Sequence, residues 1–311
     1  MEKKGLKLRM ALTGGVLLAV YLFVVVIVAS LVVGLVGGND LLALLLAAVI
    51  TTGFVALQYV GSRQIILQLI DAQELSADEH PEIHERVEVL CDRMDLPKPT
   101  LLVGDVGMMN AFALGRPGNG FVVLTPQLIQ ALTMDEMEGI LAHELAHLDS
   151  YDVVVMAAAQ SAIVMVALLV RYTIALFVSV FAFSVEFALS FVGLGKGDRS
   201  QKWARLQFVL VGVSVFLVTN VLALFQRMLS RHREYFADSK AVEHTGDVDA
   251  MTSALDTVAT QDTPSDDQVS EHVQALCVYG EHDGILERLY ATHPSTEKRI
   301  ESLRREYGSD V

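Results

Sequence analysis

Cysteine and positive charge are both scarce in this sequence. The only two cysteines among its 311 residues, Cys91 and Cys277, stand far apart. They lack the paired spacing of a zinc knuckle or a redox motif, so we expect both to be reduced core thiols. Lysine and arginine total 23 against 37 aspartate and glutamate residues, which gives a net charge of -14. This acidic balance argues against nucleic acid as a partner.

Long hydrophobic runs dominate the first part of the chain, and 52% of all residues are hydrophobic. No charged residue occurs in 10–38, a run that is long enough to cross a hydrocarbon core of about 30 Å and too long for a signal-peptide core. A second run covers 41–60. Four basic residues precede the first run and Arg63 follows the second, so the positive-inside rule predicts a cytoplasmic N-terminus. We therefore predict a retained transmembrane hairpin at 1–61, followed by a cytoplasmic domain.

The segment 62–152 has the patterns of both helices and strands. Residues 81–96 show the periodicity of an amphipathic helix, and residues 98–106 predict a short strand. The stretch 107–129 predicts two further strands joined by a turn at 117–120. Thr133 and Glu136 have the spacing of a capping box, so a helix should start there and run through His147.

That predicted helix carries the motif "HELAH". His143 and His147 are four residues apart, so both imidazoles point the same way and can hold one zinc ion, while Glu144 is placed as general base on a water that the metal activates. A catalytic zinc needs a third protein ligand, and Glu234 in "SRHREYFAD" is the best candidate. Asp238 follows four residues later, so one carboxylate can bind metal while the other orients a ligand histidine. From spacing alone, a solvated helix face explains this charged stretch equally well.

Four motifs, "NAFALG", "HELAH", "SRHREYFAD" and "THPSTEKRI", are separated by hydrophobic stretches over nearly the whole chain. Together they resemble the HtpX-like membrane zinc metalloproteases, relatives of the CaaX prenyl proteases. The resemblance implies one zinc ion per chain, bound by His143, His147 and Glu234. It also implies that Glu144 is the catalytic base and that Asp238 supports a ligand from behind.

The fourth motif departs from the family pattern. Pro294 is followed by Ser295, where the family usually has a second proline. Two residues of this motif, His293 and Arg299, therefore have open roles. They either support the oxyanion or only pack against the metal-binding helix.

The motif "NAFALG" is similar to an edge strand that lines the substrate cleft in the family. The residues concerned are Asn110, Ala111, Phe112 and Ala113. An exposed edge binds an extended peptide through its backbone, which would favour unfolded segments over one fixed sequence. A strand buried in a small sheet fits the same residues equally well.

The metal hypothesis constrains the membrane topology, because His143 and Glu234 must lie on the same side of the bilayer. Residues 153–194 would form a helix of about 60 Å, twice the core thickness, so they cannot be a single simple span. We expect one crossing within 153–183, an interfacial remainder and a return through 206–229, which gives four spans in total. The alternative is a hairpin within 153–194, with 206–229 lying along the cytoplasmic surface.

These features predict a mainly α, polytopic membrane protein with a helical, gluzincin-type zinc-metalloprotease domain and a small β-sheet. The expected regions are the hairpin at 1–61, a cytoplasmic catalytic part at 62–152, a second membrane region at 153–229 and a cytoplasmic C-terminal part at 230–311. The resemblance implies a plasma-membrane zinc endopeptidase that cleaves misfolded or damaged membrane proteins, or other unfolded polypeptides, at the cytoplasmic face. The alternatives are a CaaX-type prenyl-protein protease and a non-catalytic membrane scaffold or transporter. The oligomeric state stays open.

Overall fold

The computed structural model describes residues 12, 15–16, 19–27, 29–30, 33, 40–106, 108–192, 199–261 and 295–308. The chain divides into two compact units. The first, which we name the sheet unit, comprises Met1–Gly15, Thr52–Ala158 and Arg227–Val311, and the second, the apolar unit, comprises Val16–Thr51 and Ala159–Gln226. Every candidate site residue that the structure describes belongs to the sheet unit. Cys277 and His293 lie outside the described residues.

Four short strands form a single mixed sheet in the order β1-β2-β4-β3. The strands are β1 (Gln73–Glu74), β2 (Thr100–Val103), β3 (Ala111–Arg116) and β4 (Asn119–Leu124). β2 and β4 are parallel, while β1 and β3 each run antiparallel to their single neighbour. The predicted strand at 98–106 and the predicted hairpin are thus confirmed. Pro117 and Gly118 join β3 to β4, and the φ of 79° at Gly118 suits the glycine position of a type II turn.

Among the described residues, five shorter helices belong to the sheet unit, and three long helices carry the apolar runs that follow residue 39. The shorter ones are α3 (Pro81–Met94), α4 (Pro126–Ala131), α5 (Met134–Asp149), α8 (Val248–Gln261) and α11 (Thr296–Tyr307). The long ones are α2 (Asp40–Leu69), α6 (Asp152–Phe191) and α7 (Arg199–Thr245). The amphipathic helix predicted at 81–96 is therefore confirmed as α3, which buries Cys91 together with its apolar face. Burial raises the pKa of the Cys91 thiol to about 11, as expected for an unreactive core cysteine.

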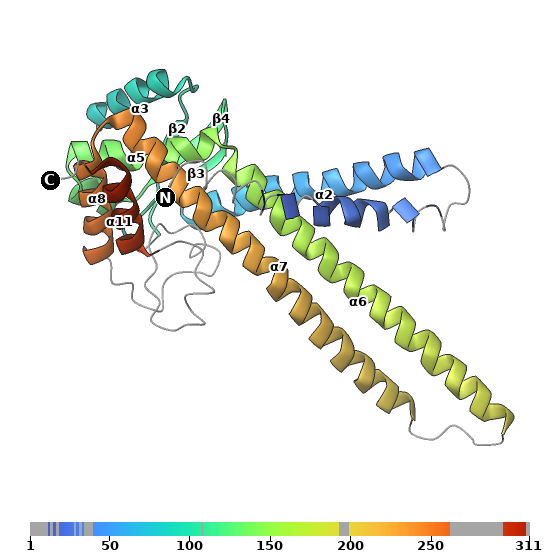
Figure 1. The fold of residues 1–311 in the computed structure, drawn as a ribbon. Helices are drawn as coiled ribbons and strands as arrows, with labels where there is room; N and C mark the ends of the chain where they lie inside the picture. The colour runs from blue at the N-terminus through green and yellow to red at the C-terminus, as the bar shows by residue number, and fades with distance from the viewer. Residues whose placement is uncertain are drawn as a thin grey trace. The chain divides into compact units, whose positions relative to one another are not determined.

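Helix α5 is the centre of the sheet unit. It packs against β3 and β4 and against α3 and α8, and eleven of its sixteen residues are buried (Figure 1). A helix buried on so many sides needs small residues where its neighbours come closest. Gly139 is such a position, because a Cβ there would lie 3.3 Å from the Cα of Met251 in α8. The predicted capping box is confirmed: the Thr133 hydroxyl accepts from the Glu136 N–H, and the Glu136 side chain accepts from the Thr133 N–H.

Among the described residues, three helices are long and apolar enough to cross a membrane. They contain Leu45–Gln68, Asp152–Phe191 and Gln201–Thr245. The second run of the predicted hairpin, 41–60, is confirmed as helical within α2, whereas much of the first run, 10–38, lies outside the described residues. Helix α6 runs without a break for 40 residues, so the alternative of a hairpin within 153–194 is wrong (Figure 1). The number of crossings stays a prediction.

Replacing Thr133 with alanine should lower the free energy of unfolding by about 1 kcal/mol, because the first turn of α5 loses its capping hydroxyl. The midpoint of denaturant unfolding of the detergent-solubilised protein measures the change. Thr260→Ala is the matched control: its exposed hydroxyl donates back to the Asp256 and Thr257 carbonyls within α8, and alanine is the better helix former. Equal losses in the two variants would contradict the capping role.

Candidate metal centre

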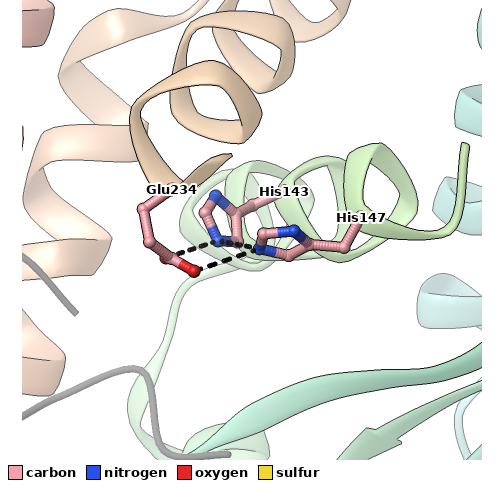
Figure 2. Close-up of side chains that lie close together, drawn as sticks. All are labelled: His143, His147 and Glu234. Carbon is pink, nitrogen blue, oxygen red and sulfur yellow. Dashed lines mark hydrogen bonds and ion pairs between the residues drawn. The ribbon is translucent and has the colours of Figure 1, made fainter. Parts of the chain in front are cut away.

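Two helices bring three potential metal ligands to one point. His143 and His147 lie one turn apart on α5, with their Nε2 atoms 3.0 Å from each other. Glu234 comes from α7 and places its Oε2 3.5 Å from the His143 Nε2 and its Oε1 3.6 Å from the His147 Nε2. Figure 2 shows both imidazoles and the carboxylate pointing toward one another. All three ligand atoms lie within 4.8 Å of one another.

The hydrogen bonds behind the two rings fix which nitrogen faces this point. The Nδ1 of His143 lies 2.9 Å from an oxygen of Asp238, and the Nδ1 of His147 lies 2.6 Å from an oxygen of Asp152. An ionised carboxylate only accepts hydrogen bonds, so each Nδ1 donates and each neutral ring turns its Nε2 lone pair inward. Two lone pairs beside a carboxylate repel one another unless a proton or a metal cation lies between them. The donor set therefore fits a cation.

The spacing of the three ligand atoms also fits zinc. Zinc binds nitrogen and oxygen ligands at about 2.0–2.1 Å, and in tetrahedral geometry such ligands are roughly 3.4 Å apart. Here the two Nε2 atoms are 3.0 Å apart, and the nearest Glu234 oxygens lie 3.5 Å from His143 (Oε2) and 3.6 Å from His147 (Oε1). Three protein ligands that leave a fourth position open are the pattern of a catalytic rather than a structural zinc site.

Burial and neighbouring charges shift the pKa values of two residues at this centre. Burial opposes charging of His143, but the hydrogen bonds with the Asp238 and Glu234 carboxylates outweigh it and raise the pKa of His143 to about 10. Without a cation this imidazole thus retains a proton, which a metal must displace. Burial also raises the pKa of the Glu144 carboxyl, against the opposing effect of the two histidines. A carboxyl shifted upward in this way suits proton transfer near neutral pH.

Arg299 of α11 supports the side of the centre where His143 lies. It binds both Asp238 oxygens, with the Nε at 2.8 Å and an Nη at 2.6 Å. The same Nη lies 3.5 Å from each nitrogen of the His143 ring, and the other Nη lies 3.7 Å from Glu234. The side chain has no exposed surface. Of the two roles that the sequence left open, these contacts fit packing against the metal-binding helix, because Arg299 lies against Asp238 and the His143 ring.

No motif in the sequence indicated Asp152 and Arg233 as site residues. Helix α5 ends at Asp149, and a short turn with a left-handed Tyr151, at φ 54°, starts α6 at Asp152. One carboxylate oxygen of Asp152 binds His147, and the other lies 2.7 Å from the Nε of Arg233. The available signals were an aspartate at the very start of an apolar run and an arginine directly before Glu234. Neither signal indicates by itself that the two residues meet.

The structure gives the "NAFALG" strand features of both interpretations. Among the described strands, β3 lies at the edge of the sheet and has β4 as its only neighbour, as the resemblance implies. The side chains of the four residues concerned are nevertheless buried: Asn110, Ala111, Phe112 and Ala113. Ala111 and Ala113 belong to the apolar core that contains α5, whereas Phe112 belongs to a second apolar cluster with Ile70 and Leu102. At most 8% of the surface of each of the four residues is exposed, backbone included, as in the interpretation of a buried strand.

Comparison with known proteins relates the whole chain to one family. A model of the family described as Peptidase family M48 matches residues 77–307. "Protease HtpX homolog" of Halobacterium salinarum is 32% identical over 288 residues, which cover 86% of this chain and 92% of that protein. The protein of the same name from Aquifex aeolicus is 32% identical over 87% of this chain and 85% of its own length. "Protease HtpX homolog 1" of Streptomyces coelicolor is 36% identical over 85% of each chain.

A solved structure shares the fold at lower sequence identity. The crystal structure of S. mikatae Ste24p matches with a TM-score of 0.51 and 17% identity. The match covers 94% of this chain but 63% of that chain, so the present chain spans a little under two thirds of the larger protein. At this identity the likeness concerns the fold alone.

Replacing Arg299 with lysine should weaken metal binding about 10- to 100-fold, because a single ammonium cannot bind both oxygens of Asp238 and hold His143 in place. Competition with a chelator of known affinity measures the change. Arg305→Lys on the same helix is the control, since Arg305 is exposed and pairs only with Glu301. Wild-type affinity in Arg299→Lys would exclude the supporting role.

Proposed function

The chain belongs to peptidase family M48, and from this premise we propose that it is a zinc endopeptidase that cleaves misfolded or damaged membrane proteins at the cytoplasmic face of the cell membrane. One observation carries the chemical part of the proposal. The Nε2 atoms of His143 and His147 and the carboxylate of Glu234 converge at 3.0–3.6 Å, with both Nδ1 atoms held by carboxylates. This donor set is the one that a catalytic zinc requires.

The protein side chains divide the chemistry among them. When bound, zinc would supply Lewis-acid polarisation of the scissile carbonyl and lower the pKa of a water molecule. Glu144 lies next to His143 in sequence and is almost fully buried, and its raised pKa lets it take a proton from that water and pass it to the leaving amine. Asp238 and Asp152 keep the two histidines in the tautomer that presents Nε2.

The edge strand supports a preference for extended polypeptides. Within the part of the chain that the structure describes, β3 has β4 as its single strand neighbour, and an added strand would pair with its other backbone edge. Recognition through the backbone depends on an unfolded segment and little on its side chains. Segments of this kind are exposed in damaged membrane proteins and in unfolded chains, which is why we propose both as substrates.

The apolar helices and the basic residues of the chain support a membrane location with the metal site in the cytoplasm. Three helices have the length and apolar character of spans. Asp152, the support of one ligand, is the first residue of α6, and Glu234 follows the apolar run of α7 by five residues. The basic residues before the first apolar run favour a cytoplasmic N-terminus, and an even number of crossings would then keep the metal ligands in the cytoplasm.

The substitution Glu144→Gln should slow peptide hydrolysis about 100- to 10,000-fold, because the amide cannot accept the proton of the water. Zinc content should stay at the wild-type level, because Glu144 is not a proposed ligand. Cleavage of an unfolded reporter polypeptide and elemental analysis measure the two properties. Glu138→Gln, on the same helix but paired with Arg86 and Arg93, should retain activity. Retained cleavage in Glu144→Gln would show that this residue is not the base. Wild-type protein that contains no zinc would reject the proposal of a zinc endopeptidase.

The substitution Glu234→Gln should instead reduce zinc affinity by more than the 10- to 100-fold typical of an outer supporting residue, because a charged ligand is lost. Chelator competition measures the affinity. Glu243→Gln, an exposed position on the same helix, is the control. If Glu234→Gln binds zinc as tightly as this control does, the third ligand is another residue.

A further inference from the structure

We propose that Asp152 and Arg233 are positioning residues that hold His147 as a metal ligand. The inference rests on the proposed zinc site and extends it to two residues outside the ligand set. Asp152 lies 2.6 Å from the His147 Nδ1 and 2.7 Å from the Nε of Arg233, so its two oxygens join the ligand to the arginine. The carboxylate and the guanidinium are both nearly buried, with 7% and 9% of their side-chain surface exposed.

His147 needs such a support more than the other histidine does. Its side chain is 14% exposed, whereas that of His143 is 2% exposed and is enclosed by Asp238 and Arg299. A partly exposed imidazole can rotate or change tautomer unless its outer nitrogen is held. Among the described residues, Asp152 is the hydrogen-bond partner of the His147 Nδ1. Asp152 therefore determines which nitrogen of His147 faces the metal.

Arg233 fixes Asp152 and the third ligand together. Its Nε lies 2.7 Å from one Asp152 oxygen, which holds the carboxylate in the orientation in which the other oxygen faces the His147 Nδ1. Arg233 also directly precedes Glu234 on α7, so the ion pair to Asp152 fixes the turn of α7 that presents Glu234. A series of contacts thus runs from His147 through Asp152 to Arg233, which is covalently joined to Glu234. A metal bound by His147 and Glu234 would close this series into a ring.

The two sides of the centre follow the same pattern. His143 is held by Asp238, which binds Arg299, and His147 is held by Asp152, which binds Arg233. Each histidine therefore has a carboxylate behind it and a buried arginine behind the carboxylate. The first set comes from α7 and α11, and the second comes from the start of α6 and from α7. This repetition argues that the ion pair between Asp152 and Arg233 serves the ligand and does not only tie two helices together.

The test compares zinc affinity and cobalt spectra of full-length variants. Asp152→Ala should lower zinc affinity about 10- to 100-fold, and Asp152→Asn should lower it less, because the amide oxygen can still accept from the Nδ1–H. Arg233→Met should behave like Asp152→Ala, and Arg233→Lys should recover much of the affinity. The Co²⁺-loaded variants should also show altered visible absorption, because the orientation of His147 changes.

Asp149→Ala is the matched control. Asp149 forms an ion pair with Lys240 between α5 and α7, close to the same turn, but contacts no metal ligand. It should therefore keep the zinc affinity and the Co²⁺ absorption of the wild type, whatever its unfolding midpoint. Equal losses of zinc affinity in Asp149→Ala and Asp152→Ala would mean that the ion pair between Asp152 and Arg233 only stabilises helix packing, and this result would overturn the proposal. Unchanged zinc affinity and unchanged Co²⁺ absorption in Asp152→Ala and Arg233→Met would also overturn the proposal. A wild-type protein that binds no zinc would instead reject the proposed function.

Discussion

The structure of the sheet unit depends on one electrostatic constraint, the convergence of two imidazole lone pairs and a carboxylate in a buried place. Such a group of donors is unfavourable by itself, because burial removes the water that would screen their repulsion. It persists only where the surrounding protein holds each donor and a cation balances them. His143, His147 and Glu234 are held in this way by residues from α6, α7 and α11. The packing of these elements is therefore inseparable from the chemistry of the site.

The formal charges around the centre indicate the kind of cation that fits. Four carboxylates surround it, and two arginines contact them: Glu144, Asp152, Glu234 and Asp238, with Arg233 and Arg299. With neutral histidines, the four negative and two positive charges leave an excess of two negative charges, which one divalent cation balances. The pKa of His143 is raised by its hydrogen bonds with Asp238 and Glu234, and the pKa of Glu144 is raised by burial, so both groups hold protons more firmly when no cation is present.

The sequence predicted those parts of the site that follow from regular helices. Four-residue spacing places His143 with His147, and the capping box sets where their helix begins, because both patterns act within one or two turns. Asp238 was found as a partner of Glu234 for the same reason. Asp152 was not found, since its position depends on the left-handed Tyr151 in a turn that no motif marks. The role of Arg299 could not be predicted, because it depends on how α11 packs. The hairpin alternative for α6 was wrong, because an apolar composition suits one long helix as well as two short ones.

The residues of the centre come from helices far apart in the sequence, which links metal binding to the fold. α5, α7 and α11 meet at the centre although about 150 residues separate the first histidine from the supporting arginine. A ligand that binds only the folded arrangement stabilises it in proportion to its concentration and affinity. The excess negative charge has the opposite effect when no cation is present, because buried like charges repel. Metal binding and the packing of these three helices must therefore strengthen each other, and the carboxylate and arginine pairs behind the histidines are the contacts through which they do so.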